Sequence, residues 1–166
     1  MPRAMNALHM ANNRAYETQR TNNFEIQIVD VGGEDLTFAC TTAGLPNESN
    51  NPINLAYGNT NVKVAGTTEV ADVTVSVKDF IEADIEAIVR RWRREVYNED
   101  TGEIGWAVDY KRRAYIYLYS PDGSVKRTWI LEGVWPSSVA WGDLTYDGGA
   151  VREISMTLSV DTATIE

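Results

Sequence analysis

Residues 154–161, with the sequence I-S-M-T-L-S-V-D, limit the fold more than any other part of this chain. Apolar and small polar residues alternate along this run without interruption, which is the period of a strand with one buried and one exposed face. Residues 70–78 alternate in the same way, with Val73, Val75 and Val77 on one face. We therefore expect a sheet with a polar face that is backed by an apolar core.

Further strands are indicated on both sides of a central segment. Residues 24–28 alternate, and the P-D-G-S turn at 121–124 predicts a hairpin. The other expected strands are 36–42, 114–119 and 125–132, the last of them ended by Pro136. The breaker-rich residues 44–52 predict a loop, and the extended pieces 53–57 and 61–64 predict a projecting hairpin.

A helix is predicted over residues 80–97, because apolar residues recur there at helical spacing. Asp79 is expected to cap its first turn. The residues of the apolar stripe are Ile81, Ile85, Ile88, Val89, Trp92 and Val96. The expected class is mainly β: an antiparallel β-sandwich or barrel with one flanking α-helix and a projecting loop. Residues 1–23 are expected to be an N-terminal arm, and residues 24–166 a single domain.

Composition excludes several kinds of site. The 166 residues include one cysteine, Cys40, and one histidine, His9, so neither a disulfide framework nor a metal site is expected. The net charge of −9 argues against tight nucleic-acid binding, because phosphate contacts need clustered cations. We find no transmembrane run and no signal-peptide pattern, so the expected product is a soluble protein made in the cytosol, without a membrane partner.

The candidates for chemistry are weak. The arginine run at 90–94 is better interpreted as the solvated or partner-facing side of the helix than as a nucleic-acid site. The acids Glu95, Glu99, Asp100 and Glu103 lie at a helix end and a turn, where no pocket can be argued. Cys40 is expected to be a small buried hydrophobe. We therefore expect no enzyme and no cofactor. The five Trp and eight Tyr residues indicate core packing or interface anchors, and the sequence leaves both open.

Several segments, in their order and spacing, resemble the tail tube proteins of contractile-tailed bacteriophages. Val75–Asp79 (V-S-V-K-D) leads into the helix that holds Trp92, and Ala65 stands where the family often has Pro before the glycine. The other matching segments are 23–26 (N-F-E-I), 40–46 (C-T-T-A-G-L-P), 62–66 (V-K-V-A-G) and 129–136 (W-I-L-E-G-V-W-P), followed by the final strand.

This resemblance implies hexameric rings that stack into a hollow tube inside a contractile sheath and conduct the genome. The implied partners are further copies of the chain, the sheath protein, and baseplate and terminator proteins. DNA would pass through the lumen without specific binding, and the protein would be assembled in the host cytoplasm and reside in the virion tail. The alternatives are the tube of a type VI or other injection system, a soluble ligand-binding β-barrel and, weakest, a hydrolase.

Because of this resemblance, two sets of residues are expected at assembly surfaces. Small polar side chains and carboxylates suit a bore that phosphates slide through. The expected lumen-lining residues are Asp72, Thr74, Ser76, Glu153, Ser155, Thr157 and Ser159. Lys78 departs from this pattern and is expected at the rim or beside an acid. Residues 44–64 are expected to contact a neighbouring subunit or ring through Leu45, Pro46, Ile53, Leu55 and Tyr57.

Overall fold

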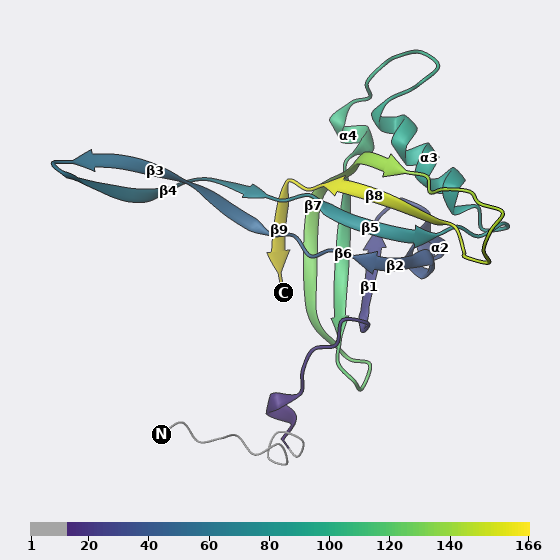
Figure 1. Cartoon of the computed structure of the whole chain (residues 1–166), viewed down its shortest axis with the longest axis horizontal. Helices are drawn as coiled ribbons and strands as arrows, with labels where there is room; N and C mark the ends of the chain where they lie inside the picture. The colour runs from purple at the N-terminus through teal and green to yellow at the C-terminus, as the bar shows by residue number, and fades with distance from the viewer. Residues whose placement is uncertain (1–12) are drawn as a thin grey trace.

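Two layers of antiparallel strands enclose an apolar core in the computed structural model, which describes residues 13–166 (Figure 1). The first layer contains β1 (Phe24–Ile28), β6 (Arg112–Tyr119), the first part of β7 (Val125–Ala140) and β9 (Thr162–Ile165). The second contains β2 (Cys40–Ala43), β5 (Val73–Lys78), β8 (Glu153–Ser159) and the second part of β7. The strands of the two layers cross steeply, as in orthogonal sheet packing. The mainly β class is confirmed.

The alternating runs behave as their period predicts. Val75 of β5 lies opposite Met156 of β8, and both side chains are almost fully buried. Ser76 lies opposite Ser155 on the other face, and their hydroxyl oxygens are 3.2 Å apart. The strand bounds are narrower than predicted, because β5 begins at Val73 and β8 ends at Ser159. The chain then turns into β9, a strand that the alternation alone does not separate from β8.

β7 joins the two layers, and the expected break at Pro136 is wrong. Before the bend at Gly133, β7 pairs with β6 and β9; after it, Val134 still pairs with Arg112 of β6, and from Trp135 onward β7 pairs with β8. Gly133 has φ +68°, and a Cβ there would lie 2.1 Å from an Asp161 carboxylate oxygen, so the bend requires glycine. The register shifts between Pro136 and Ser138, and such an irregularity accommodates a residue without an N–H.

The helices differ from the single flanking helix that was predicted. Residues 36–42 were expected to be a strand, but α2 (Gly33–Ala39) precedes the short β2. Leu36 and Ala39, three residues apart, are both buried, whereas Phe38 is 81% exposed, which is a helical burial pattern. A further short helix, α4 (Ala107–Tyr110), follows the main one, and a 3-10 turn, η1 (Arg14–Tyr16), lies in the part of the arm that is described.

The main helix, α3 (Ile85–Val96), begins five residues later than predicted. Its N-cap is Asp84, which has φ +45° and accepts a hydrogen bond from the Ala87 N–H. Asp79 also caps the first turn, as predicted, because its carboxylate accepts a hydrogen bond from the Glu86 N–H at 3.3 Å. Ile81 therefore lies outside the helix and is fully exposed. The rest of the predicted stripe is confirmed, since Ile85, Val89, Trp92 and Val96 are buried and Ile88 is partly buried against the core.

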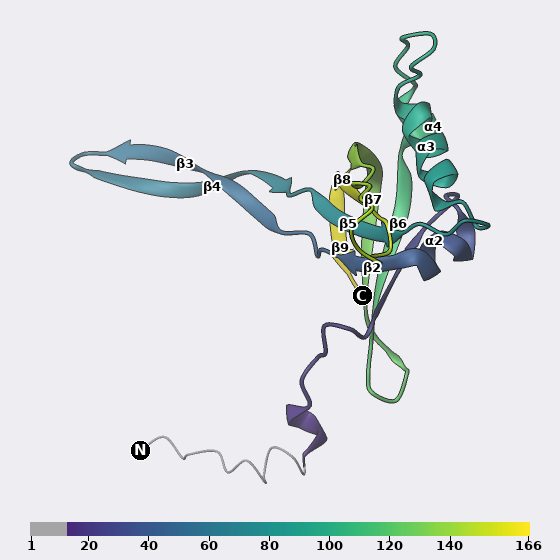
Figure 2. The same ribbon diagram turned by 45° about the vertical axis from the view of Figure 1, so that its right-hand side comes forward.

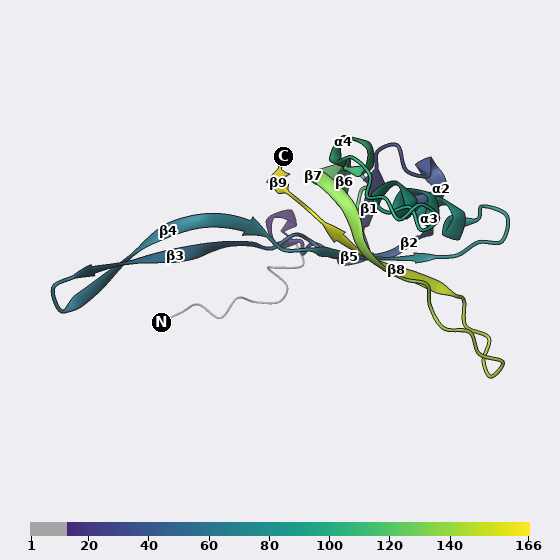
Figure 3. The ribbon, with the colours of Figure 1, turned by 90° about the horizontal axis from the view of Figure 1, so that it is seen from above.

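A long hairpin of β3 (Glu48–Tyr57) and β4 (Thr60–Val70) projects from the two layers (Figures 2 and 3). The projection is confirmed, but the loop predicted over 44–52 is wrong from Glu48 onward. β3 pairs with β4, and the register shifts at a bulge between Asn50 and Pro52. Pro52, which has no N–H, therefore removes no hydrogen bond from the middle of a larger sheet. The Asn50 side chain donates to the Thr68 hydroxyl at 2.6 Å across the bulge.

An ionic cluster ties α3 to the second layer. Arg152 donates to a carboxylate oxygen of Asp79 at 3.0 Å, to one of Glu86 at 2.6 Å and, through Nε, to the Trp141 carbonyl at 3.0 Å. Arg90 also pairs with Glu86. The hydrogen bond from Arg152 is the main reason that the pKa of Glu86 lies below its ordinary value, because it stabilises the charged carboxylate.

We expect the Glu86 contribution to subunit stability to disappear in acid. A carboxylate whose pKa is lowered by folding stabilises the fold above its unfolded pKa of about 4.5, and this stabilisation is lost as the pH falls through the folded value. The destabilisation caused by Glu86→Gln should therefore shrink as the pH falls below 4.5. Urea unfolding of the dissociated subunit at several pH values measures this change in the free energy of unfolding. Glu82→Gln is the control, because Glu82 is exposed and forms no ion pair with residues 13–166. A pH-independent Glu86→Gln effect contradicts the prediction.

Candidate functional site

The outer face of the second layer presents small polar side chains. Thr74 lies opposite Thr157, and Ser138 of β7 continues the same row beyond Thr157. The structure thus brings the predicted lumen residues of β5 and β8 together on one face, with Ser159 opposite Trp135 at its end. The orientation of this face toward a lumen stays a prediction.

Among the predicted lining residues, the charged ones lie only at the ends of this polar face. Asp72 is exposed just before β5, and Glu153 opens β8. Lys78, the residue that departs from the pattern, lies opposite Glu153 in the strand register. The centre of the face is therefore uncharged, and its ends carry two acids and one base.

The distal hairpin has one apolar face. Ile53 pairs with Val64 and Leu55 with Val62, so these side chains project to the same side, as does that of Tyr57. We call this set of five residues the ribbon face. All five side chains are exposed, with exposed fractions from 41% at Val64 to 80% at Tyr57. The opposite side is polar or small, with Asn54, Ala56, Asn61 and Lys63.

Sequence reasoning found part of this surface and missed part of it. Val62 and Val64 were not singled out, although their alternation with Asn61 and Lys63 is the signal that places them with Leu55. Leu45 is 44% exposed in the segment before the hairpin. Pro46 is buried within the subunit, so it is not available as a contact residue in the folded subunit.

A tyrosine row lies on the outer face of the first layer; the alternating aromatics at 115, 117 and 119 were visible in the sequence but were not assigned to a surface. Tyr115 and Tyr117 are stacked with ring centroids 6.1 Å apart. The Tyr119 hydroxyl donates to the Glu25 carboxylate at 2.7 Å, and this hydrogen bond is the main reason that the pKa of Tyr119 rises to about 12. Trp92 is buried, as core packing predicts, whereas Trp106 is 80% exposed and its role as an interface anchor stays a prediction.

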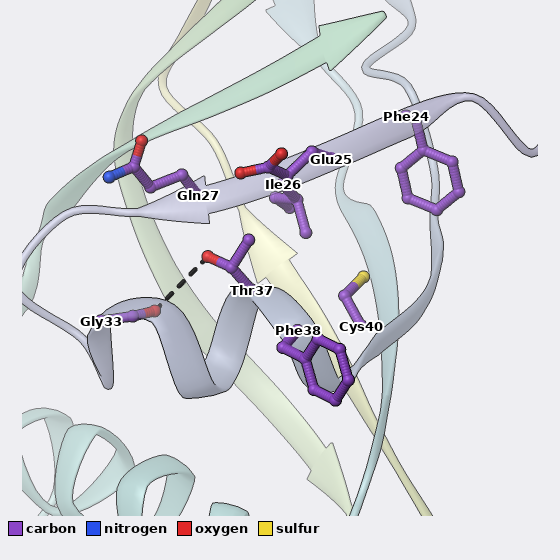
Figure 4. A pocket seen from close by; sticks show the side chains of 8 residues that line it. All are labelled: Phe24, Glu25, Ile26, Gln27, Gly33, Thr37, Phe38 and Cys40. Carbon is purple, nitrogen blue, oxygen red and sulfur yellow. Dashed lines mark hydrogen bonds between the residues drawn. The ribbon is translucent and has the colours of Figure 1, made fainter. Parts of the chain in front are cut away.

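A groove of about 640 Å³ opens between β1 and α2 (Figure 4). Phe24, Phe38 and Cys40 point toward it from three elements. Burial raises the pKa of the Cys40 thiol to about 11, which keeps it protonated and unreactive. The groove lies at the side of the layers, whose interior is filled by the core, so it is not the closed aromatic-lined pocket of a ligand-binding barrel.

Two of the acids weighed for chemistry, Glu95 and Asp100, form ion pairs with arginines. Glu95 accepts from Arg112 at 2.8 Å, and Asp100 lies 3.8 Å from Arg94. Over residues 13–166 no three acidic, cysteine or histidine side chains gather as a metal site, while His9 lies outside the described residues. Within the same range no helix is long and apolar enough to cross a membrane.

Solved structures share this fold. A chain of the anti-feeding prophage cap structure superposes with a TM-score of 0.73 at 17% identity, covering 90% of this chain and 91% of that one. A chain of the PVC extracellular contractile injection system sheath–tube complex superposes with a TM-score of 0.72 at 14% identity, covering 98% and 99%. The fold is thus that of proteins found in contractile injection particles.

Two phage proteins are similar to this chain in sequence. The tail tube protein gp19 of Enterobacteria phage T4 is 28% identical over 156 residues, which covers 89% of this chain and 94% of that protein. The gp19 protein of phage T6 is also 28% identical over 156 residues. No family profile matches the chain. Similarity over nearly the whole of both proteins, together with the shared fold, supports the resemblance to tail tube proteins and a structural role in the virion tail.

Proposed function

We propose that the chain forms hexameric rings that stack into the inner tube of a contractile tail and conduct the genome. The main support for this proposal is the ribbon face, an exposed apolar surface on a hairpin that projects from a well-packed core. Monomeric proteins seldom expose such a surface unless a partner covers it. The sheath, baseplate and terminator are the expected partners, in keeping with the particles in which the fold occurs.

Electron microscopy of the purified protein at high concentration tests the proposal. We expect hollow rods of stacked rings with six subunits in projection. A protein that stays a monomer at every concentration, even with a baseplate extract present as a template, contradicts it. Tails recovered from infected cells distinguish a phage tube from the tube of another injection system, because a phage tail is attached to a DNA-filled capsid.

We further propose that the polar face of β5 and β8 lines the lumen. Its small hydroxyl side chains leave the bore open, and the acids at its ends discourage phosphate adhesion. The division of the chain into an arm at 1–23 and one domain at 24–166 belongs to the same proposal. Gln19 in the described part of the arm donates to the Tyr119 carbonyl at 3.1 Å, so at least this residue docks on the first layer.

Charge reversal tests the lumen assignment. Tubes that carry Asp72→Lys and Ser76→Lys should form but retain DNA, with a retention that falls steeply as salt rises, because cationic surfaces release counterions when they bind phosphates. DNA that co-sediments with the tubes at several salt concentrations measures this. The matched control is Glu132→Lys with Thr164→Lys, which adds the same charge to the outer face of the first layer. The assignment is wrong if the control retains the DNA, or if bulky reagents excluded from the tube label the new lysines at positions 72 and 76.

A further inference from the structure

A second exposed apolar surface lies at the end of the subunit opposite the hairpin tip. It consists of Phe38 of α2 with Phe80 and Ile81 of the segment between β5 and α3, and we call it the end patch. The Phe38 and Phe80 rings contact each other with centroids 6.0 Å apart. Phe38 is 81% exposed and Ile81 fully exposed. Figures 1, 2 and 3 all place the segment before α3 at one extremity of the subunit and the hairpin tip at the other.

The end patch is held in position on both sides. Asp79 bonds to Arg152 at 3.0 Å, and the Asp79 N–H donates to the Arg152 carbonyl at 3.1 Å. On the other side Asp84 caps α3. Ile81 is thus presented on a short, anchored turn, and solvent-exposed apolar side chains held in this way are typical of a binding surface.

The charges beside the two surfaces are complementary. Residues 52–65 of the hairpin contain one charged residue, Lys63, and the turn that carries Ile81 contains the exposed Glu82. Neither side chain forms an ion pair with the rest of the described chain. An apolar centre with opposite charges at its rim is the usual anatomy of a protein interface.

We propose that the ribbon face of one subunit packs on the end patch of a neighbouring copy, with Lys63 and Glu82 at the rim. This inference rests on the proposed tube function and names the surface that receives the hairpin. Because the two surfaces differ and lie at opposite ends, the contact is heterologous: each copy covers one neighbour and is covered by another. Such contacts propagate through an assembly, whereas a self-complementary contact would end at a dimer.

A matched pair of substitutions gives the first test. Ile81→Ser should raise the protein concentration needed for tube formation by about tenfold or more, as expected for loss of an interface anchor. Ile104→Ser is the control, because Ile104 is also an exposed isoleucine, at 77%, and lies on the separate connection between α3 and α4. Both variants should melt with the wild-type subunit, since neither side chain is buried. Equal effects of the two substitutions on assembly overturn the inference.

Photo-crosslinking gives the second test and needs no loss of assembly. A benzophenone amino acid at position 55, on the ribbon face, should attach to peptides that contain Phe38 or Ile81 in assembled tubes, as mapped by mass spectrometry. The same group at position 56, on the opposite side of the hairpin, should not. Tubes in which position 55 attaches elsewhere overturn this inference and leave the tube function standing. Failure of the unmodified chain to form tubes overturns the tube function itself.

Discussion

Replacing Trp92 with alanine should lower the free energy of unfolding of the dissociated subunit by about 3–5 kcal/mol, the usual cost of emptying a large aromatic site in a core. Trp92 is 2% exposed on the buried side of α3, and its indole N–H donates to the Tyr110 carbonyl at 2.8 Å. The substitution removes the ring that joins α3 to the core and leaves the Tyr110 carbonyl without its donor. Urea or thermal unfolding under conditions that prevent assembly measures the effect.

Trp106→Ala is the matched control, because it removes the same side chain from an 80% exposed position. Its effect should stay within about 0.5 kcal/mol, as for most surface substitutions. Trp92→Phe should fall between the two, because phenylalanine keeps most of the packing but loses the hydrogen bond. A Trp92→Ala subunit that unfolds with the wild type shows that Trp92 does not support the core.

Shortening the hairpin should abolish tube formation and leave the subunit folded. The change removes residues 54–63 and joins Ile53 to Val64 through Asn-Gly, a pair that forms the tight turn of a two-residue hairpin. These two residues are neighbours in the β3–β4 register, so the junction preserves the remaining strand pairs. The removed side chains are exposed, so little buried area is lost. Negative-stain images report assembly, and circular dichroism with thermal melting reports the fold.

The position of this deletion matters. Removal of 46–51, which lie within the loop expected over 44–52, would take out the buried Pro46 and strand residues that pair with β4. It would therefore affect folding as well as assembly. A milder comparison uses the two sides of the hairpin: Leu55→Ser with Val62→Ser should impair stacking, whereas Ala56→Ser with Asn61→Ser should not. Normal tubes from the shortened chain rule out the hairpin as a connector.

The candidate surfaces could be predicted only in part. The alternation of β5 and β8 places Thr74 and Thr157 on the polar side whatever their neighbours are, because side chains of a strand alternate between its two faces. The exposed hairpin was also visible, as apolar residues between breakers. The end patch was not, because Ile81 continues the helical spacing of Ile85 and Ile88, and only the left-handed backbone of Asp84 excludes it from the helix.

Local sequence determined the class of this protein, the strands around the long alternating runs, the apolar side of α3 and the resemblance to tail tube proteins. These features depend on residues within one helical turn or two strand positions of each other, so the local sequence is enough to predict them. Tertiary structure decided where α3 begins, that residues 33–39 form a helix, and that β7 continues past Pro136 by changing partners at Gly133. The change of partners at Gly133 depends on the Asp161 side chain beside it, and the start of α3 depends on the contacts of Arg152 with Asp79 and Glu86. These contacts join residues distant in the sequence, which no local pattern records.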